Sequence, residues 1–264
     1  MVGANKVGAL KGTVANQPEY PLLVIDAGNT AVKFALVTRK NAVPRLLRVL
    51  PTGKLTVGAA RKIGATASAV VIASVVPSAS RLLKRAFPTA RFIGSRTQLG
   101  VRTLVDGKTI GSDRLANVAA AQVRFGRNVL VASFGTAATF DVIDKRGIHL
   151  GGAIAPGWSS FAALTSANTA QLPRIDQGKP TNAIGRNTRE ALRAGVNGGY
   201  AALVSQLVAQ MKKEAKANNA RVVFTGGDAA TVAKLTGLKV ITDPLLTLKG
   251  IAILAGPTVR EGRK

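Results

Sequence analysis

The sequence predicts an α/β fold in which two similar domains face each other across a cleft. Apolar runs of strand length alternate with helical segments along its 264 residues. Hydrophobic residues make up 47% of the chain and charged residues 19%, the composition of a globular protein. A strand–turn–strand pattern in the first half returns in the second half, which suggests the two domains.

In the first half of the chain, the sequence predicts three strands and two helices. A strand–turn–strand unit is expected at residues 21–38 and a buried strand at residues 69–76, and the helices are expected at residues 78–87 and 113–123. The unit turns at Asp26 to Thr30, where turn-forming residues follow an apolar run. Pro77 ends the buried strand, and Ser112 or Asp113 is expected to cap the second helix.

The second half predicts four strands and three helices. The strands are expected at residues 128–133, 139–143, 221–224 and 240–241, and the helices at residues 188–216, 229–235 and 248–255. Gly195, Gly198 and Gly199 allow close packing or a break within the first of these helices. The glycine-rich segment Gly151 to Trp158 is expected to be a flexible loop that lines a cleft.

The internal repeat relates two apolar strands and the turns that follow them. Residues 23–37 lie over residues 130–144, and the same offset places Ser133 opposite Asp26 and Gly135 opposite Gly28. The repeat predicts domains at residues 21–125 and 126–264, after a short disordered extension at residues 1–20. Chance similarity between two buried hairpins is the alternative.

Composition excludes several kinds of site. The chain has no cysteine, which rules out disulfides and thiolate metal sites and favours a cytoplasmic location. The single histidine, His149, cannot form a multi-histidine zinc site, and its position after Gly147 predicts a surface or loop histidine. No stretch has the roughly 18 to 20 apolar residues that would span a bilayer.

The net charge of +25 is the most unusual global property. Such a charge could indicate a polyanionic partner. Lysine and arginine are nevertheless scattered rather than clustered, and aromatic residues, which single-stranded nucleic acids stack on, make up only 4%. We therefore expect no specific nucleic-acid site, and a surface that favours anionic substrates such as ATP.

Asp26, Ala27, Gly28, Asn29 and Thr30 form the first motif with chemical potential. An aspartate at the end of a buried strand can hold Mg²⁺ or its waters, because Mg²⁺ prefers oxygen ligands. Gly28 allows backbone N–H groups to approach phosphate oxygens, and Lys33 could add a positive charge. An ordinary hairpin turn is the alternative.

Gly111, Ser112, Asp113 and Arg114 form the second motif. Asp113 could accept a proton from a substrate hydroxyl, while Arg114 binds a carboxylate or phosphate. The start of a helix would help to keep Asp113 ionised. The alternative is a helix cap beside a surface arginine.

Two further turns could bind a nucleotide. Ser133 to Thr139, with Gly135 and Thr136, offers backbone N–H groups and hydroxyls to phosphates. Gly226 and Gly227 follow the strand at residues 221–224, and a base or ribose could pack on their backbone. Each motif is weak alone, because glycine-rich loops are common in α/β proteins.

Together, the motifs resemble the type III pantothenate kinases of the acetate and sugar kinase/actin superfamily. The resemblance extends over residues 22–255 and rests on five segments in the family's order, namely Asp26–Lys33, Gly111–Arg114, Gly135–Thr139, Gly151–Gly157 and Asn182–Thr188, with Gly195. It implies two ribonuclease-H-like (actin-like ATPase) domains, a homodimer, and ATP-dependent phosphorylation of pantothenate, the first step of coenzyme A biosynthesis.

The resemblance also assigns roles to residues. Asp26 to Lys33 and Thr136 match the ATP site, and Gly111 to Arg114 match the pantothenate site, with Asp113 as the proton acceptor. Thr188 matches a further pantothenate contact. ATP and Mg²⁺ are the implied cofactors.

Two positions depart from the family pattern. Ser133 stands where the family commonly has an aspartate that binds a monovalent cation, K⁺ or NH₄⁺. The segment Thr103 to Lys108 lacks the tyrosine that commonly touches pantothenate. A non-catalytic regulatory relative and a kinase of another hydroxy acid remain alternative functions.

Overall fold

The computed structural model describes residues 18–94, 97, 100–106, 109–167, 172–173, 175–178 and 182–256. Most of the expected N-terminal extension, residues 1–17, lies outside the described residues. Tyr20, from its last part, packs against the core beneath the first sheet. Among the described helices, none is long and apolar enough to cross a membrane.

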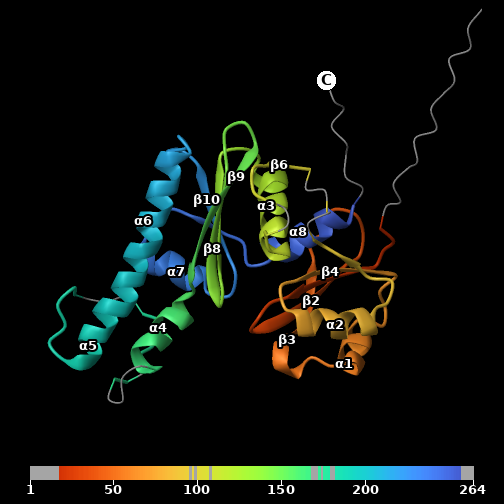
Figure 1. Ribbon diagram of the computed structural model, residues 1–264, viewed down its shortest axis with the longest axis horizontal. Coiled ribbons are helices and arrows are strands. Elements are labelled where there is room, and N and C mark those ends of the chain that lie inside the picture. Colours follow the sequence, from red (N-terminus) through yellow and green to blue (C-terminus); the bar gives the residue numbers. More distant parts are fainter. Residues whose placement is uncertain are drawn as a thin grey trace, which may run out of the picture.

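Two sheets form the frame of the molecule (Figure 1). The strand order in the first sheet is β3 (Arg45–Pro51), β2 (Ala31–Val37), β1 (Leu22–Ala27), β4 (Ala69–Ser74) and β5 (Arg91–Phe92). In the second sheet it is β9 (Ile148–Pro156), β8 (Ala137–Ile143), β7 (Val129–Phe134), β10 (Arg221–Thr225) and β11 (Ile241–Thr242), with β6 (Arg102–Thr103) added beside β9.

The two sheets have the same topology. In each, the first two neighbouring pairs are antiparallel and the last two are parallel. The repeated sequence pattern coincides with the β1–β2 hairpin in one sheet and the β7–β8 hairpin in the other. The predicted α/β class and the predicted duplication of a ribonuclease-H-like domain are therefore confirmed.

Helices α1 (Val57–Ile63) and α2 (Pro77–Ala86) cover one face of the first sheet. The side chain of Thr56 caps α1 by accepting the N–H of Ala59, and Pro77 occupies the first turn of α2. The short 3₁₀ turn η1 (Thr52–Lys54) joins β3 to this layer.

Helices α3 (Ser112–Phe125) and α8 (Leu246–Ala255) lie between the two sheets (Figure 1). One face of α3 packs with α8 on β1 and β4, and its other face packs on β7 and β10. The helices cross closely at Gly250, where any side chain would collide with the backbone of Ala116. A buried hydrogen bond from the Thr247 hydroxyl to Asn117 Oδ1, 2.8 Å long, joins them.

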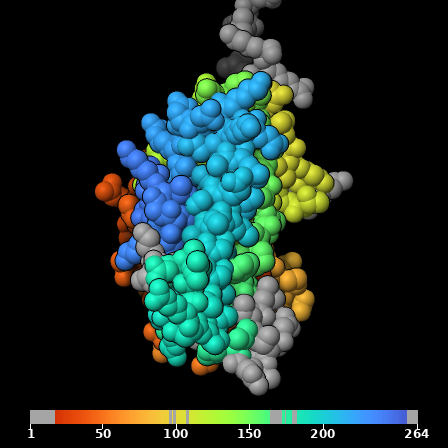
Figure 2. All heavy atoms as spheres, turned by 90° about the vertical axis from the view of Figure 1, so that its left-hand side faces the viewer, coloured from red at the N-terminus to blue at the C-terminus, as the bar shows by residue number. Residues whose placement is uncertain are grey.

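The outer face of the second sheet carries a third layer of helices, after the α1–α2 and α3–α8 layers. It contains α4 (Trp158–Ala167), α5 (Thr188–Leu192), the π-helical turn η2 (Arg193–Gly198), α6 (Gly199–Glu214) and α7 (Ala229–Thr236). Figure 2 shows α5 and α6 covering this side of the molecule. The predicted helix at residues 188–216 is thus present, with the π-helical turn at its glycines.

Several expectations about local structure are wrong. The segment Gly151 to Pro156 is part of strand β9 rather than a flexible loop. Gly111, not Ser112 or Asp113, is the capping residue of α3. His149 is fully buried rather than a surface or loop residue, because it lies inside β9 and has polar partners on β8 and β6.

The boundary between the domains at residues 125 and 126 stays a prediction. Helix α8 comes from the second half of the chain, yet Leu248, Ile251 and Leu254 belong to the core beneath the first sheet. The two halves are therefore tied together by a helix as well as by the chain between them.

Candidate active site

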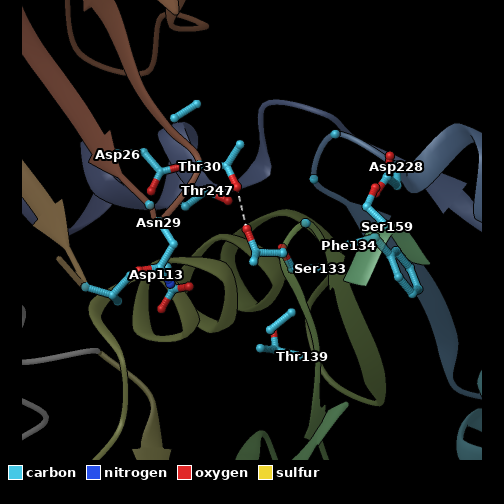
Figure 3. A pocket seen from close by; sticks show the side chains of 18 of the residues that line it. Asp26, Asn29, Thr30, Asp113, Ser133, Phe134, Thr139, Ser159, Asp228 and Thr247 are labelled. Carbon is cyan, nitrogen blue, oxygen red and sulfur yellow. Dashed lines mark hydrogen bonds between the residues drawn. The ribbon is translucent and has the colours of Figure 1, made fainter. Parts of the chain in front are cut away.

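A cleft of about 610 Å³ lies between the two sheets and collects residues from most of the predicted motifs (Figure 3). Its lining includes the ends of β1 and β7, the start of α3, the start of α4 and the turn after β10. The predicted site residues in this lining are Asp26, Gly28, Asn29, Thr30, Lys33, Asp113, Ser133, Gly135, Thr136, Gly226 and Gly227.

Asp26 lies at the end of β1, beside its partner strand β2. Its carboxylate is 4.0 Å from the Lys33 ammonium, and its side chain is only 15% exposed. Burial raises the pKa of Asp26 to about 6, while Lys33 opposes the rise and Asp113 adds to it. A buried carboxylate with one distant cationic neighbour retains oxygen lone pairs that a hydrated Mg²⁺ could use.

The two glycine turns approach each other across the cleft. The Gly28 N–H donates to Ala31 O and the Gly135 N–H donates to Ala137 O, so each turn is closed by a backbone hydrogen bond from its glycine, and the second turn is one residue shorter than the first. The Thr30 and Thr136 hydroxyls form a hydrogen bond of 2.6 Å between the two turns (Figure 3). The two halves of the repeat therefore present their turns to one space.

Asp113 lies in the first turn of α3 and faces the same space. Its Oδ1 accepts the N–H of Arg114 at 2.8 Å. Burial raises the pKa of Asp113, and the hydrogen bond and charge of Arg114 oppose the rise. A side chain at Gly111 would come against the Asp113 carboxylate, which would have to shift from its present position.

The opposite wall comes from residues that the sequence reasoning did not select. Ser159 and Ser160 begin α4, and the Ser160 hydroxyl donates to Thr136 O at 2.8 Å. Asp228 follows the glycine pair, and Thr247 is contributed by α8. The position of Asp228 after two glycines was the available sequence signal, whereas nothing local pointed to Thr247.

Gly226 has a structural reason to be glycine. Its φ of +92° is in the left-handed region, and a side chain there would collide with the backbone of Phe134. The turn after β10 therefore packs directly on the end of β7. This contact places the Gly226–Gly227 turn beside the turn that contains Gly135.

Four predicted residues adjoin the cleft without lining it. Ala27 is buried beneath the first turn, and Gly111, Ser112 and Arg114 flank Asp113. The hydroxyl of Ser112 is buried and has no hydrogen-bond partner among the described residues. The Arg114 guanidinium is bound to Asp141, at 2.7 and 3.1 Å.

Thr188 lies outside the cleft. It is the exposed first residue of α5, after Asn187, whose side chain caps the helix by accepting the Glu190 N–H at 2.9 Å. The carboxylate of Glu190 accepts the N–H of Arg186, the residue before the cap. A local capping function accounts for this segment within one chain.

The cleft offers oxygen donors rather than a preformed metal cage. Among the described residues, no group of three or more histidine, cysteine, aspartate or glutamate side chains could hold a metal ion. Single carboxylates at Asp26, Asp113 and Asp228 line the space. This donor set fits Mg²⁺, which keeps several waters and is commonly bound through one or two carboxylates together with phosphates.

Comparison with solved structures agrees with the fold. A Campylobacter jejuni protein described as a Baf family transcriptional activator matches with a TM-score of 0.62 at 22% identity, over 88% of this chain and 96% of that chain. The ethanolamine utilization protein EutJ from Carboxydothermus hydrogenoformans matches with a TM-score of 0.52 at 14% identity, over 88% and 89%. At these identities the likeness concerns the fold alone.

Comparison of sequences identifies the family. A type III pantothenate kinase of Akkermansia muciniphila is 38% identical over 240 residues, which cover 89% of this chain and 98% of that protein. One of Thermus thermophilus is 41% identical over 191 residues, 69% of this chain and 75% of that protein. The family model described as type III pantothenate kinase matches residues 22–210. This chain belongs to the type III pantothenate kinase family.

Proposed function

We propose that this cleft catalyses the ATP-dependent phosphorylation of pantothenate to 4′-phosphopantothenate, the first step of coenzyme A biosynthesis. The chain is an enzyme of the pantothenate kinase family. The observation that carries the proposal is the convergence of two glycine turns from two sheets on one cleft that also contains Asp113. Turns of this kind cradle a triphosphate, and the carboxylate beside them can serve the acceptor hydroxyl.

The two turns are the proposed ATP site. Backbone N–H groups near Gly28 and Gly135 and the hydroxyls of Thr30 and Thr136 would bind phosphate oxygens. The hydrogen bond between the two hydroxyls would be exchanged for bonds to phosphate. The ribose or base would pack on the backbone of Gly226 and Gly227, with Ala27, Asn29 and Lys33 completing the site.

Asp26 is the proposed partner of Mg²⁺, through water. The ion would neutralise charge on the triphosphate, while Lys33 stays close enough to hold the carboxylate in place. Burial disfavours the ionisation of Asp26, and a cation beside it would oppose that effect.

Asp113 is the proposed general base. The pantothenate hydroxyl oxygen attacks the γ-phosphorus, the bond to the β–γ bridging oxygen breaks, and ADP leaves. The hydroxyl proton passes to the Asp113 carboxylate, whose raised pKa makes it a better acceptor than an ordinary aspartate. Gly111, Ser112 and Arg114 would bind the rest of pantothenate, and positioning would supply much of the acceleration.

Further properties belong to the same proposal. We expect a homodimer in the cytoplasm, with Thr188 contributing to pantothenate binding although it lies outside the cleft of one chain. A monovalent cation, if used, would lie near Ser133, which lines the cleft at the end of β7. Size-exclusion chromatography with light scattering would measure the oligomeric state.

The decisive experiment measures ADP release by the purified protein with Mg²⁺ and ATP, against a panel of small hydroxy acids that includes pantothenate. We expect ADP release to depend on pantothenate and to match formation of its phosphate ester. A greater rate with another hydroxy acid would identify a different substrate. Folded protein without ADP release for any acceptor would favour the regulatory alternative.

A further inference from the structure

A buried polar cluster behind Asp113 joins four elements of the structure. Arg114 of α3 donates from Nε and Nη2 to the two carboxylate oxygens of Asp141 on β8, at 3.1 and 2.7 Å. His149 Nε2 on β9 lies 2.8 Å from Asp141 Oδ1, and its Nδ1 lies 2.9 Å from the Thr103 hydroxyl on β6. Asp141 and His149 are 1% and 0% exposed.

The partner of His149 Nε2 identifies the donor in this bond. An ionised carboxylate can only accept, so Nε2 of His149 carries a hydrogen and donates it to Asp141. Nδ1 forms a hydrogen bond with the Thr103 hydroxyl, whose oxygen accepts the Val105 N–H at 3.1 Å. Three donors thus fix the Asp141 carboxylate, and the imidazole of His149 is held from both sides.

Asp141 uses only one edge of the Arg114 guanidinium. The edge formed by Nε and Nη2 is bound to the carboxylate, which leaves the edge formed by Nη1 and Nη2 outside this pair. A guanidinium binds a second carboxylate in the same bidentate manner through that other edge. Arg114 also follows Asp113 directly, and its backbone N–H is bound to the Asp113 carboxylate.

We propose that Asp141 and His149 are positioning residues, which orient Arg114 so that its second edge binds the carboxylate of pantothenate beside Asp113. This inference rests on the proposed function and adds two residues that the sequence motifs did not contain. Asp141 sets the plane of the guanidinium, and His149 sets the plane of the Asp141 carboxylate.

A purely structural ion pair accounts less well for the arrangement. The desolvation cost of burying an ion pair can exceed its Coulomb attraction, and apolar residues in place of such a pair are often equally or more stabilising. Here the Asp141 carboxylate is buried and receives a third donor from a fully buried histidine, while the Arg114 side chain is 13% exposed and follows the proposed base directly. Functional side chains need supporting hydrogen bonds that hold them in one orientation, and Asp141 and His149 supply such support to Arg114.

The charges of the cluster also act on Asp113. Arg114 lowers the pKa of the Asp113 carboxyl, Asp141 raises it, and both effects are smaller than that of burial. The other charged side chains in the described lining of the cleft are Asp26, its neighbour Lys33, and Asp228. Removing the charge of Asp141 leaves Arg114 unopposed, so the acid limb of the pH–rate profile should move to lower pH.

The test compares Asp141→Asn, His149→Leu and His149→Gln with the wild type in steady-state kinetics. Glutamine can present a donor at the place of Nε2, whereas leucine cannot. For Asp141→Asn we expect a rise in the KM for pantothenate of about tenfold or more, the scale of a lost charged hydrogen bond. We expect the KM for ATP to change little. His149→Leu should also raise the KM for pantothenate, by less than Asp141→Asn does, and His149→Gln should bring this KM most of the way back to the wild-type value.

Binding by calorimetry supplies a readout that does not depend on turnover. Pantothenyl alcohol, which has a hydroxymethyl group in place of the carboxylate, should bind the wild type and His149→Leu equally, whereas pantothenate should bind His149→Leu more weakly. Equal losses for both compounds, or equal rises in the two KM values, would overturn the inference. Absence of turnover by the wild type would refute the proposed function, and calorimetry would still decide the inference about Asp141 and His149. If Asp141→Asn fails to fold, the two His149 variants decide the inference.

Discussion

Asp26→Asn should stabilise the ligand-free protein while abolishing its activity. The Asp26 side chain is 15% exposed, and burial raises its pKa from 3.8 to about 6 in spite of Lys33. The ionised carboxylate is therefore less stable in the native state than in the unfolded chain. Asparagine has nearly the same shape and carries no charge, so it removes this penalty.

The magnitude follows from the size of the shift. Each unit of pKa corresponds to about 1.4 kcal/mol, so ionised Asp26 costs the native state about 3 kcal/mol at pH 8. Between pH 6 and pH 4 the native state binds the proton more tightly than the unfolded state. The wild type should therefore gain stability on acidification, and its difference from Asp26→Asn should shrink towards zero near pH 4.

Asp144→Asn is the matched control, because the pKa of Asp144 is lowered in the folded protein whereas that of Asp26 is raised. Burial acts to raise the pKa of Asp144, but the Ile148 N–H and the Arg146 side chain together lower it by more. Ionised Asp144 thus stabilises the native state above its unfolded pKa, and this stabilisation is lost as the pH falls through its folded pKa. Asp144→Asn should destabilise the protein at pH 8, and the effect should fade in acid.

The assay is urea unfolding followed by circular dichroism at pH 8 and near pH 4.5, with EDTA and without nucleotide. A second series with Mg²⁺ and ADP should stabilise the wild type and have a smaller effect on Asp26→Asn, since ligands that bind the native state raise its stability. If Asp26→Asn were less stable than the wild type at pH 8, the reasoning about its buried charge would be refuted.

Three further predictions concern catalysis and binding. Asp113→Asn should lower kcat by about a hundredfold or more, the scale of a positioned general base, with an unchanged circular dichroism spectrum; near-normal turnover would show that Asp113 only begins a helix. Because Ser133 offers a neutral hydroxyl to a cation, initial rates in potassium, ammonium, sodium and a bulky organic cation should differ little for the wild type and more for Ser133→Asp; a steep potassium requirement unchanged by the substitution would contradict this. DNA and RNA binding, measured by fluorescence anisotropy, should be weak, sequence-blind and abolished by moderate salt, and tight binding to one sequence near physiological salt would disprove that expectation.

The elements that could be predicted from the sequence are those specified by adjacent residues. The β1–β2 and β7–β8 hairpins have apolar runs that are buried along most of their length, joined by turns of glycine and small polar residues. Their repetition was enough to predict two domains. Helix α3 was also predicted from its alanine-rich sequence, although its cap was expected at Ser112 or Asp113 and is Gly111.

The elements that escaped prediction depend on neighbours far along the chain. Strand β3 carries arginines and is mostly exposed, so its sequence lacks the apolar run of a buried strand. Strand β9 contains Gly151 and Gly152, which resemble a loop. A side chain at Gly152 would collide with the backbone of Phe140 on β8, so a glycine is needed here inside a strand.

The same distinction applies to the candidate site. The residues of the two turns were found because each turn is a continuous segment, whereas Thr247 and Ser159 reach the cleft from separate helices. His149 was misjudged because its partner Asp141 lies on the neighbouring strand. Arg114 was selected, but its ion pair with Asp141 depends on the packing of α3 against β8, which no local pattern specifies.

The packing of α3 against α8 explains how several weak motifs form one site. Each turn is fixed within its own sheet, so the distance between the turns depends on what separates the sheets. That spacer is the α3–α8 pair, whose close crossing depends on the absence of a side chain at Gly250 and on the hydrogen bond between Thr247 and Asn117. The same pair supplies Asp113 and Thr247 to the cleft lining. The element that sets the width of the cleft therefore also carries the proposed base, so a change in helix packing would alter the position of Asp113 and the separation of the phosphate-binding turns together.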